Sequence, residues 1–263
     1  MGSLSKQQVE EIAQHLENAE LKAQEVAKIT DDYPNMTCDD AYDIQWEIRR
    51  TKESRGTKIV GMKMGLTSRA EIAEMGIDKP CYGFLADYAA IPDGGDIKYD
   101  ELIHPKVEAE LAFVTKAPLK GPGINIGDVL RATDFVMPAV EVIDSRYRNF
   151  SFDVNSVIAD NSSSSRFVAG GAMAKAEDLD LKNLGVVLEV NGNVVQIGAG
   201  AEVLGHPASS IASLANQLAE RGEAIPAGTF IMVGAITTAV SVNKGDYFNV
   251  RYQGLGSVSG RFI

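Results

Sequence analysis

Apolar and polar positions at the start of the chain alternate with the period of amphipathic helices. After Ser5 and again after Thr37, apolar residues recur at spacings of mostly three and four. Asp40 three residues after Thr37, and Glu71 three residues after Ser68, complete capping-box patterns that mark helix starts. The pattern predicts helices over residues 6–27, 37–56 and 68–76, with a short strand over 58–64.

From about Pro80 the pattern changes to short apolar runs separated by Gly, Pro, Asn and Asp, which is typical of strands and turns. The segment Asn191-Gly192-Asn193 between two such runs predicts a hairpin. A further amphipathic helix is expected over 209–222, and a strand meander over 229–262. Helices followed by mostly antiparallel strands indicate an α+β fold. We expect a helical N-terminal subdomain over 1–78 and a β-rich domain over 79–263, forming one cooperative unit.

Composition and charge exclude several classes of protein. The chain has 263 residues, 45% hydrophobic content and a formal net charge of −11. This charge disfavours a surface for nucleic acid or anionic membrane, since both need clustered Lys and Arg. No apolar run approaches the roughly 20 residues of a membrane span, and the N-terminus lacks the apolar core of a signal peptide. The two cysteines, Cys38 and Cys81, form no disulfide framework and suit a reducing cytoplasm.

Three glutamates inside apolar strand-like runs are the strongest candidates for chemistry. Glu108 and Glu110 are two positions apart and therefore project from one face of a strand, and Glu141 lies in a second run. An exposed strand face would also explain them, but Ala112 and Val114 continue the same face and are apolar. Burying several carboxylates together requires a cation. Oxygen ligands favour Mg²⁺ or Mn²⁺ over zinc.

The three glutamates change the interpretation of other polar residues. Lys63 lies between methionines and is bracketed by Gly61 and Gly65; alone it fits a strand-edge lysine whose amine reaches water. Beside three carboxylates it becomes a charge-balancing partner or a proton donor. The loop over 160–166 is rich in donors, and Arg146 could pair with a carboxylate or with its neighbour Asp144. We expect His206 to cap or brace a helix.

With these residues assembled, the chain resembles the fumarylacetoacetate hydrolase superfamily nearly end to end. The Glu-Ala-Glu motif with a downstream Glu is the metal signature of that family and falls on Glu108, Glu110 and Glu141. The lysine of the family falls on Lys63. The resemblance is carried by residues 45–50, 58–67, 82–88, 104–110, 140–147, 159–163, 205–207 and 252–258.

Within the superfamily, the chain is most similar to the branch of decarboxylases and hydratases in meta-cleavage catabolism of aromatic compounds. The resemblance implies an α+β mixed β-sandwich roll and Mg²⁺-dependent decarboxylation of 2-oxo-3-hexenedioate to 2-hydroxypenta-2,4-dienoate and CO₂. Hydration of 2-hydroxypenta-2,4-dienoate is the alternative. Hydratases tend to carry an aspartate where this chain has Cys81, and a neutral thiol handles protons poorly, which favours decarboxylation. A non-catalytic binder of dicarboxylates, or a scaffold for the hydratase, stays open.

The same resemblance implies how the substrate is held. Lys63 would stabilise or protonate the oxyanion of the dienolate that forms, and the three glutamates would hold the metal. The carboxylate that departs has no obvious cation, so we expect it beside apolar Phe84 and Leu85. Arg146 and Ser162 are further candidates for binding it. Relatives of this kind are associated in complexes, so a homo-oligomer and a complex with a hydratase are also expected.

Overall fold

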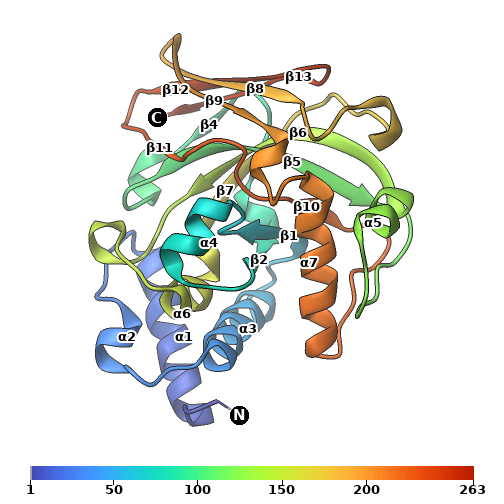
Figure 1. Ribbon diagram of the computed structural model, residues 1–263. Coiled ribbons are helices and arrows are strands. Elements are labelled where there is room, and N and C mark those ends of the chain that lie inside the picture. Colours follow the sequence, from blue (N-terminus) through green and yellow to red (C-terminus); the bar gives the residue numbers. More distant parts are fainter. Residues whose placement is uncertain (1) are drawn as a thin grey trace.

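Two β-sheets face each other in the computed structural model, which describes residues 2–263 (Figure 1). The larger sheet has the order β2-β1-β10-β5-β6-β7-β3 with β11 beside β5, and the smaller has the order β4-β13-β12-β8-β9. The strands are β1 (Ile59–Gly65), β2 (Cys81–Ala86), β3 (Ala90–Ile91), β4 (Gly95–Ile97), β5 (Lys106–Thr115), β6 (Thr133–Ile143), β7 (Ser164–Ala169), β8 (Gly185–Val190), β9 (Asn193–Ala199), β10 (Phe230–Met232), β11 (Val240–Ser241), β12 (Tyr247–Tyr252) and β13 (Gly256–Phe262).

The long antiparallel pair of β5 and β6 forms the centre of the larger sheet. Its buried apolar side chains pack against the smaller sheet, and Tyr252 on β12 donates a hydrogen bond across the gap to the carbonyl of Ala139 on β6. Phe248 and Val258 fill the space between the sheets and are fully buried. The core therefore lies between the two sheets and fixes β5 and β6, the strands that carry the three glutamates.

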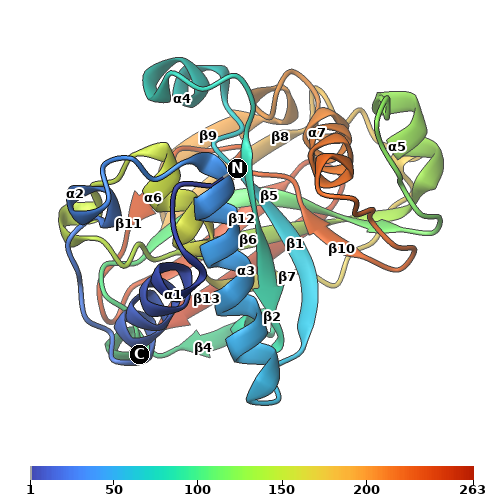
Figure 2. The same ribbon diagram turned by 90° about the horizontal axis from the view of Figure 1, so that it is seen from below.

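Helices cover the remaining faces of the larger sheet. They are α1 (Lys6–Leu21), α2 (Ile29–Asp32), α3 (Cys38–Ser54), α4 (Arg69–Met75), α5 (Ile126–Ala132), α6 (Val154–Ala159) and α7 (Pro207–Glu220). The N-terminal helices α1 and α3 lie together beneath the sheet (Figure 2), and α6 packs against α3. Gln45 on α3 donates hydrogen bonds to the carbonyl of Tyr82 on β2 at 2.9 Å and to that of Ile158 on α6 at 3.0 Å. The helical layer is thus hydrogen-bonded to the sheet.

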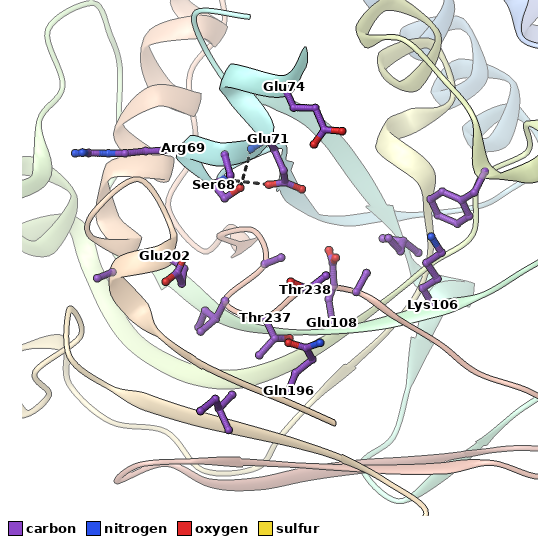
Figure 3. A pocket seen from close by; sticks show the side chains of 18 of the residues that line it. Ser68, Arg69, Glu71, Glu74, Lys106, Glu108, Gln196, Glu202, Thr237 and Thr238 are labelled. Atoms are coloured by element: carbon purple, nitrogen blue, oxygen red, sulfur yellow. Dashed lines mark hydrogen bonds between the residues drawn. The ribbon is translucent and has the colours of Figure 1, made fainter. Parts of the chain in front are cut away.

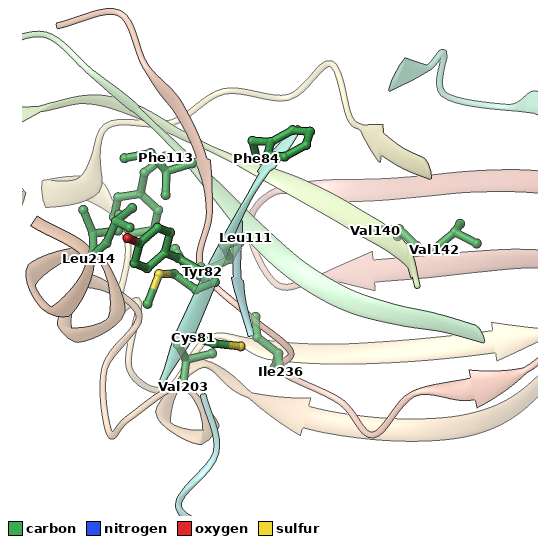
Figure 4. Packing of buried hydrophobic residues seen from close by; sticks show 14 of the residues in the cluster. Cys81, Tyr82, Phe84, Leu111, Phe113, Val140, Val142, Val203, Leu214 and Ile236 are labelled. Carbon is green, nitrogen blue, oxygen red and sulfur yellow. The ribbon is translucent and has the colours of Figure 1, made fainter. Parts of the chain in front are cut away.

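The hydrophobic core continues from the sheets to the helices. Cys81, Tyr82 and Phe84 follow one another along β2 and are buried in this cluster (Figure 4). Tyr82 also stacks on Tyr42 of α3, with ring centroids 4.3 Å apart. Strand β2 therefore joins the helical layer to the centre of the larger sheet.

Most elements agree with the sequence. Both capping boxes form, Gly76 ends α4 in the left-handed conformation, and Asn191 and Gly192 make the hairpin turn with positive φ. His206 is the N-cap of α7, where its Nδ1 accepts from the amide of Ala208. The α+β class is confirmed.

The first helix is shorter than its pattern predicted. It ends at Leu21 and not near residue 27, because the chain turns at Ala23, whose φ is positive. Val26 then pairs with Tyr147 as an isolated bridge, and its amide donates to the carbonyl of Arg146 at 2.8 Å. Tertiary pairing outweighs local helical periodicity here.

The division into residues 1–78 and 79–263 stays a prediction. Strand β1 falls in the first range and pairs with β2 and β10 of the second. Within residues 2–263, no helix has both the length and the apolar character that crossing a bilayer requires.

Candidate metal centre and active-site cavity

The register of β5 and β6 brings the three glutamates together. Glu108 stands directly opposite Glu141, and Glu110 is opposite Ala139, two positions further along. Residues two apart on a strand share a face, so all three side chains point to one side of the larger sheet. One carboxylate oxygen from each glutamate lies within 4.8 Å of the others. The arrangement has the donor set and the compactness of a cation site.

Burial makes this cluster unfavourable without a cation. Glu110 and Glu141 are 0% exposed and Glu108 is 9% exposed. The alternative that the three glutamates lie on a solvent-exposed strand face is therefore wrong. Burial and then the charge of Glu141 raise the pKa of Glu108 to about 8, and the same causes raise the pKa of Glu110 well above its ordinary value.

Two further observations test whether these residues fit a metal ion. Among the described residues, Glu110 Oε1 and Glu141 Oε1 have no hydrogen-bond partner although both are buried. By contrast, Glu110 Oε2 accepts the amide of Gly234 at 2.7 Å, which fixes the side chain. Buried oxygens without hydrogen-bond partners in so compact a cluster suit a hard divalent cation that takes oxygen ligands. The residues therefore fit such an ion.

Lys63 on β1 lies beside this cluster and is 2% exposed. Its Nζ is 3.2 Å from Glu141 Oε2 and donates to the carbonyl and the Oγ of Ser162 at 2.9 and 3.1 Å. Burial alone would lower the pKa of Lys63, but the charges of Glu141 and the other two glutamates outweigh it and raise the pKa. Lys63 is thus a fixed, protonated donor.

An unusual backbone presents Ser162 to this lysine. The three residues of the 3₁₀ turn η4 (Asn161–Ser163) all have positive φ, between 48° and 56°. Non-glycine residues rarely adopt this conformation, and its cost is accepted mostly at functional sites. The Asn161 side chain holds the turn by two hydrogen bonds to the backbone of Phe84.

Cys81 and Gly65 close the space behind Ser162. The thiol of Cys81 is 3.3 Å from Ser162 Oγ, and burial raises its pKa. A Cβ at Gly65 would lie 2.3 Å from Ser162 Oγ, so only glycine fits there. The glycines around Lys63 therefore serve close packing: Gly61 has the same role against the carbonyl of Phe230.

A cavity of about 880 Å³ opens at Glu108 (Figure 3). Glu108 lines it, together with residues of α4, of the loop over 235–239 and of β9. The capping box of Ser68 and Glu71 fixes the start of α4 at its rim. Phe150 and Phe152 supply apolar surface. The cavity has the size of a site for a small organic ligand.

The other sequence candidates lie in different places. Arg146 is buried in an ion pair with Asp160, and its Nη1 donates to the carbonyls of Asp144 and Ser164 at 2.7 and 2.9 Å, while its Nη2 donates to the carbonyl of Asp160. Phe84 and Leu85 are buried on β2. None of Arg146, Phe84 and Leu85 is among the described residues that line the cavity. Lys63 and Ser162 do not line it either, although they contact each other. Leu85 packs with Ala112 and Ala139, which share the glutamates' face of β5 and β6.

Sequence reasoning missed Lys106 and Phe150. Lys106 lines the cavity, and its Nζ lies 3.9 Å from the centre of the Phe150 ring. The signal for Lys106 was present: it precedes Glu108 by two positions and therefore shares the face of the three glutamates. Nothing local in the sequence pointed to Phe150, since a turn outside the strands brings it there.

Comparisons with known proteins agree with this geometry. The sequence model described as "Fumarylacetoacetate (FAA) hydrolase C-terminal" matches residues 59–263. The chain is 65% identical to a 4-oxalocrotonate decarboxylase of Pseudomonas putida, over 99% of both chains. It is 41% identical to the 2-oxo-hept-4-ene-1,7-dioate hydratase of Escherichia coli, over 96% of this chain and 97% of that protein.

A solved structure is also similar. The 4-oxalocrotonate decarboxylase from Pseudomonas putida G7, complexed with magnesium and adipate, has a TM-score of 0.98 to this chain. The two are 64% identical, and the match covers 99% of each chain.

Proposed function

The chain belongs to the fumarylacetoacetate hydrolase family, and we propose that it is a carboxy-lyase that decarboxylates 2-oxo-3-hexenedioate (4-oxalocrotonate) with the help of Mg²⁺ or Mn²⁺. The products are 2-hydroxypenta-2,4-dienoate and CO₂, in the catabolism of aromatic compounds by meta-cleavage. Two relatives with 65% and 64% identity over nearly the whole chain are 4-oxalocrotonate decarboxylases. The relative with 41% identity is a hydratase.

The proposed roles follow from the geometry of the site. The ion is held by Glu108, Glu110 and Glu141. When the ion is bound, it is the Lewis acid for the end of the substrate that carries the 1-carboxylate and the 2-oxo group. Lys63 is protonated and directed at the same place, so it stabilises the negative charge that develops on the 2-oxo oxygen or donates a proton to it. Ser162 positions the ammonium group of Lys63.

Electrons and atoms balance with one proton, which Lys63 or solvent supplies. Cleavage of the C5–C6 bond releases CO₂, and its electron pair forms the C4=C5 double bond. The C3=C4 pair moves to C2=C3, and the carbonyl pair moves onto the 2-oxo oxygen. Protonation of that oxygen gives 2-hydroxypenta-2,4-dienoate.

The observation that carries decarboxylation over hydration is the environment of Cys81. This position, where hydratases of the family tend to carry an aspartate, lies in the site against Ser162. Burial raises the pKa of the Cys81 thiol and keeps it neutral. Addition of water needs a group that accepts and returns a proton, and a neutral buried thiol serves this poorly.

Product analysis tests the proposal. The protein is incubated with Mg²⁺ and 2-oxo-3-hexenedioate and, separately, with 2-hydroxypenta-2,4-dienoate. We expect CO₂ from the first substrate and no hydration of the second. Hydration of the second without CO₂ from the first would identify a hydratase, and turnover of neither would favour a scaffold role.

Assembly and location form part of the proposal. We propose a homo-oligomer that also binds a 2-hydroxypentadienoate hydratase. Cys38 and Cys81 are both free thiols, as suits the reducing cytoplasm. Light scattering and co-purification with a hydratase measure the assembly.

A further inference from the structure

Lys106 enters the cavity from the strand that carries two of the metal ligands. It is the first residue of β5 and lies two positions before Glu108, on the same face. Figure 3 shows the side chains of Lys106 and Glu108 leaving the same strand and entering the cavity at separate points. The charge of Lys106 also helps to lower the pKa of Glu108, although burial dominates that pKa. A ligand bound at Glu108 could therefore extend to Lys106.

The ammonium group of Lys106 is oriented but not neutralised. Its Nζ lies 3.9 Å from the centre of the Phe150 ring, which holds a cation by its electron-rich face. No ion pair or hydrogen bond joins this Nζ to a residue in the part of the chain that the structure describes. An ammonium group has three donors, and an aromatic face uses none of them fully. The hydrogen-bond donors and the positive charge of Lys106 are thus available to a ligand.

Arg69 is the other cation in the described wall of the cavity, and it is directed elsewhere. It begins α4, and its guanidinium lies next to Gly205, 3.8 Å from where a Cβ would stand. Figure 3 shows its side chain pointing away from Glu108. Arg69 and Lys106 therefore form a matched pair of cavity cations, of which only Lys106 faces the side of the metal ligands.

We propose that Lys106 binds the carboxylate at the end of the substrate opposite the metal centre, and so selects 2-oxo dicarboxylates over 2-oxo monocarboxylates. The inference rests on the proposed function, whose substrate has such a second carboxylate. The apolar surroundings expected at Phe84 and Leu85 are the alternative; Lys106 and Phe150, unlike those two residues, line the cavity.

This role has a kinetic consequence. The second carboxylate is the one that leaves as neutral CO₂, so its attraction to Lys106 weakens as the C5–C6 bond breaks. An interaction stronger with bound substrate than with the transition state tightens binding without raising kcat. Removing it therefore raises KM and leaves kcat unchanged or higher.

Binding of two matched ligands tests the inference without turnover. 2-Oxoadipate and 2-oxohexanoate share the 2-oxo acid end and differ only in the second carboxylate, and titration calorimetry measures both on the Mg²⁺-loaded protein. We expect the wild type to bind 2-oxoadipate about 10- to 100-fold more tightly, the range of a charge-assisted hydrogen bond. Lys106→Met abolishes the preference, Lys106→Arg retains part of it, and Arg69→Met retains all of it.

Several results would overturn the inference. The inference is wrong if Lys106→Met keeps the preference for 2-oxoadipate, or if it weakens the binding of both ligands equally, as a structural role predicts. It is also wrong if Arg69→Met is the variant that abolishes the preference. Steady-state kinetics with 2-oxo-3-hexenedioate are an independent test. We expect the KM of Lys106→Met to rise about 10- to 100-fold. A fall in kcat at unchanged KM would contradict the proposed role of Lys106. If the wild type releases no CO₂, the proposed function fails, while the calorimetric preference still decides the role of Lys106.

Discussion

Asn161 binds the backbone of a single residue, Phe84, through both ends of its side-chain amide. Its Oδ1 accepts from the amide of Phe84 at 2.9 Å, and its Nδ2 donates to the carbonyl of Phe84 at 3.0 Å. This pairing fixes the left-handed turn on β2. The next residue, Ser162, presents its carbonyl to Lys63 at 2.9 Å. Asn161 therefore acts on Lys63 through the position of the turn.

Asn161→Ala should damage catalysis more than stability. Loss of two hydrogen bonds lowers the free energy of unfolding by about 2 kcal/mol. The released turn no longer positions Lys63, and a displacement of about 1 Å at a catalytic group can reduce kcat by about 100-fold. Steady-state kinetics with saturating Mg²⁺ and chemical denaturation measure the two effects.

The chain provides a matched control for this variant. Asn216 on α7 makes the same pair of bonds with the backbone of Ile124, at 3.0 and 2.9 Å, and neither residue lines the cavity. Asn216→Ala should lose comparable stability and keep its kcat. Equal loss of kcat in both variants would show that Asn161 has no special role.

Glu110→Gln should remove the metal response and leave the fold intact. The Gln side-chain oxygen can still accept the amide of Gly234, which Glu110 Oε2 accepts at 2.7 Å. The metal loses one charged ligand, so its affinity should fall by more than the roughly 10- to 100-fold typical of residues that only support a ligand.

Thermal unfolding with and without Mg²⁺ measures this loss. A ligand at about 100 times its Kd stabilises a protein by about 2.7 kcal/mol, so wild-type Tm should rise with Mg²⁺ and that of Glu110→Gln should not. Glu74→Gln changes another acid in the cavity wall, outside the three-glutamate cluster, and should respond like the wild type. A full Mg²⁺ response in Glu110→Gln would exclude Glu110 as a ligand.

The metal-free protein should lose stability as the pH rises. Burial and Glu141 raise the pKa of Glu108 from 4.5 to about 8 in the folded state. Below about 4.5 the group is protonated whether the chain is folded or not, so it has no effect. Between 4.5 and 8 the folded state binds more protons than the unfolded state, so the free energy of unfolding falls and the loss is complete above 8.

Calorimetry from pH 5 to pH 8 without metal measures this slope. Glu108→Gln should show a flatter profile, and Mg²⁺ should flatten that of the wild type, because it stabilises the ionised carboxylates. A metal-free wild type whose stability increases steadily over this range would contradict the assignment of Glu108 to the buried cluster.

Part of the candidate metal site was predictable because the constraint on Glu108 and Glu110 is local, whereas the register of β5 and β6 brings Glu141 to them. Two acids at period-two spacing inside an apolar strand, answered by Glu141, are too costly to bury without a cation. The capping boxes at Thr37 and Ser68 were predictable for the same reason, since each is decided within four residues. Their outcome does not depend on the rest of the chain.

The part of the cavity that Lys106 lines was not predictable from residues that are neighbours in the sequence. Its walls come from β5, α4, β9 and the loop over 235–239, which only tertiary packing brings together. Phe84 and Leu85 are apolar residues near the family motif, and β2 buries both without placing them in the cavity wall. The position of Lys106 beside Glu108 could be read from the sequence. The orientation of its ammonium group depends on the ring of Phe150, which is more than 40 positions away in the sequence.

Gly65→Ala should disturb Lys63 by crowding Ser162, and a second substitution should reverse the effect. The new Cβ would lie 2.3 Å from Ser162 Oγ, and such overpacking costs about 1–3 kcal/mol. Ser162→Gly removes the clashing Oγ, suits the positive φ at this position and keeps the carbonyl that Lys63 binds. In a double-mutant cycle of kcat and Tm, the pair should be more active and more stable than Gly65→Ala alone. Additive effects, or a Gly65→Ala variant that equals the wild type, would show that contact between these two residues does not position Lys63.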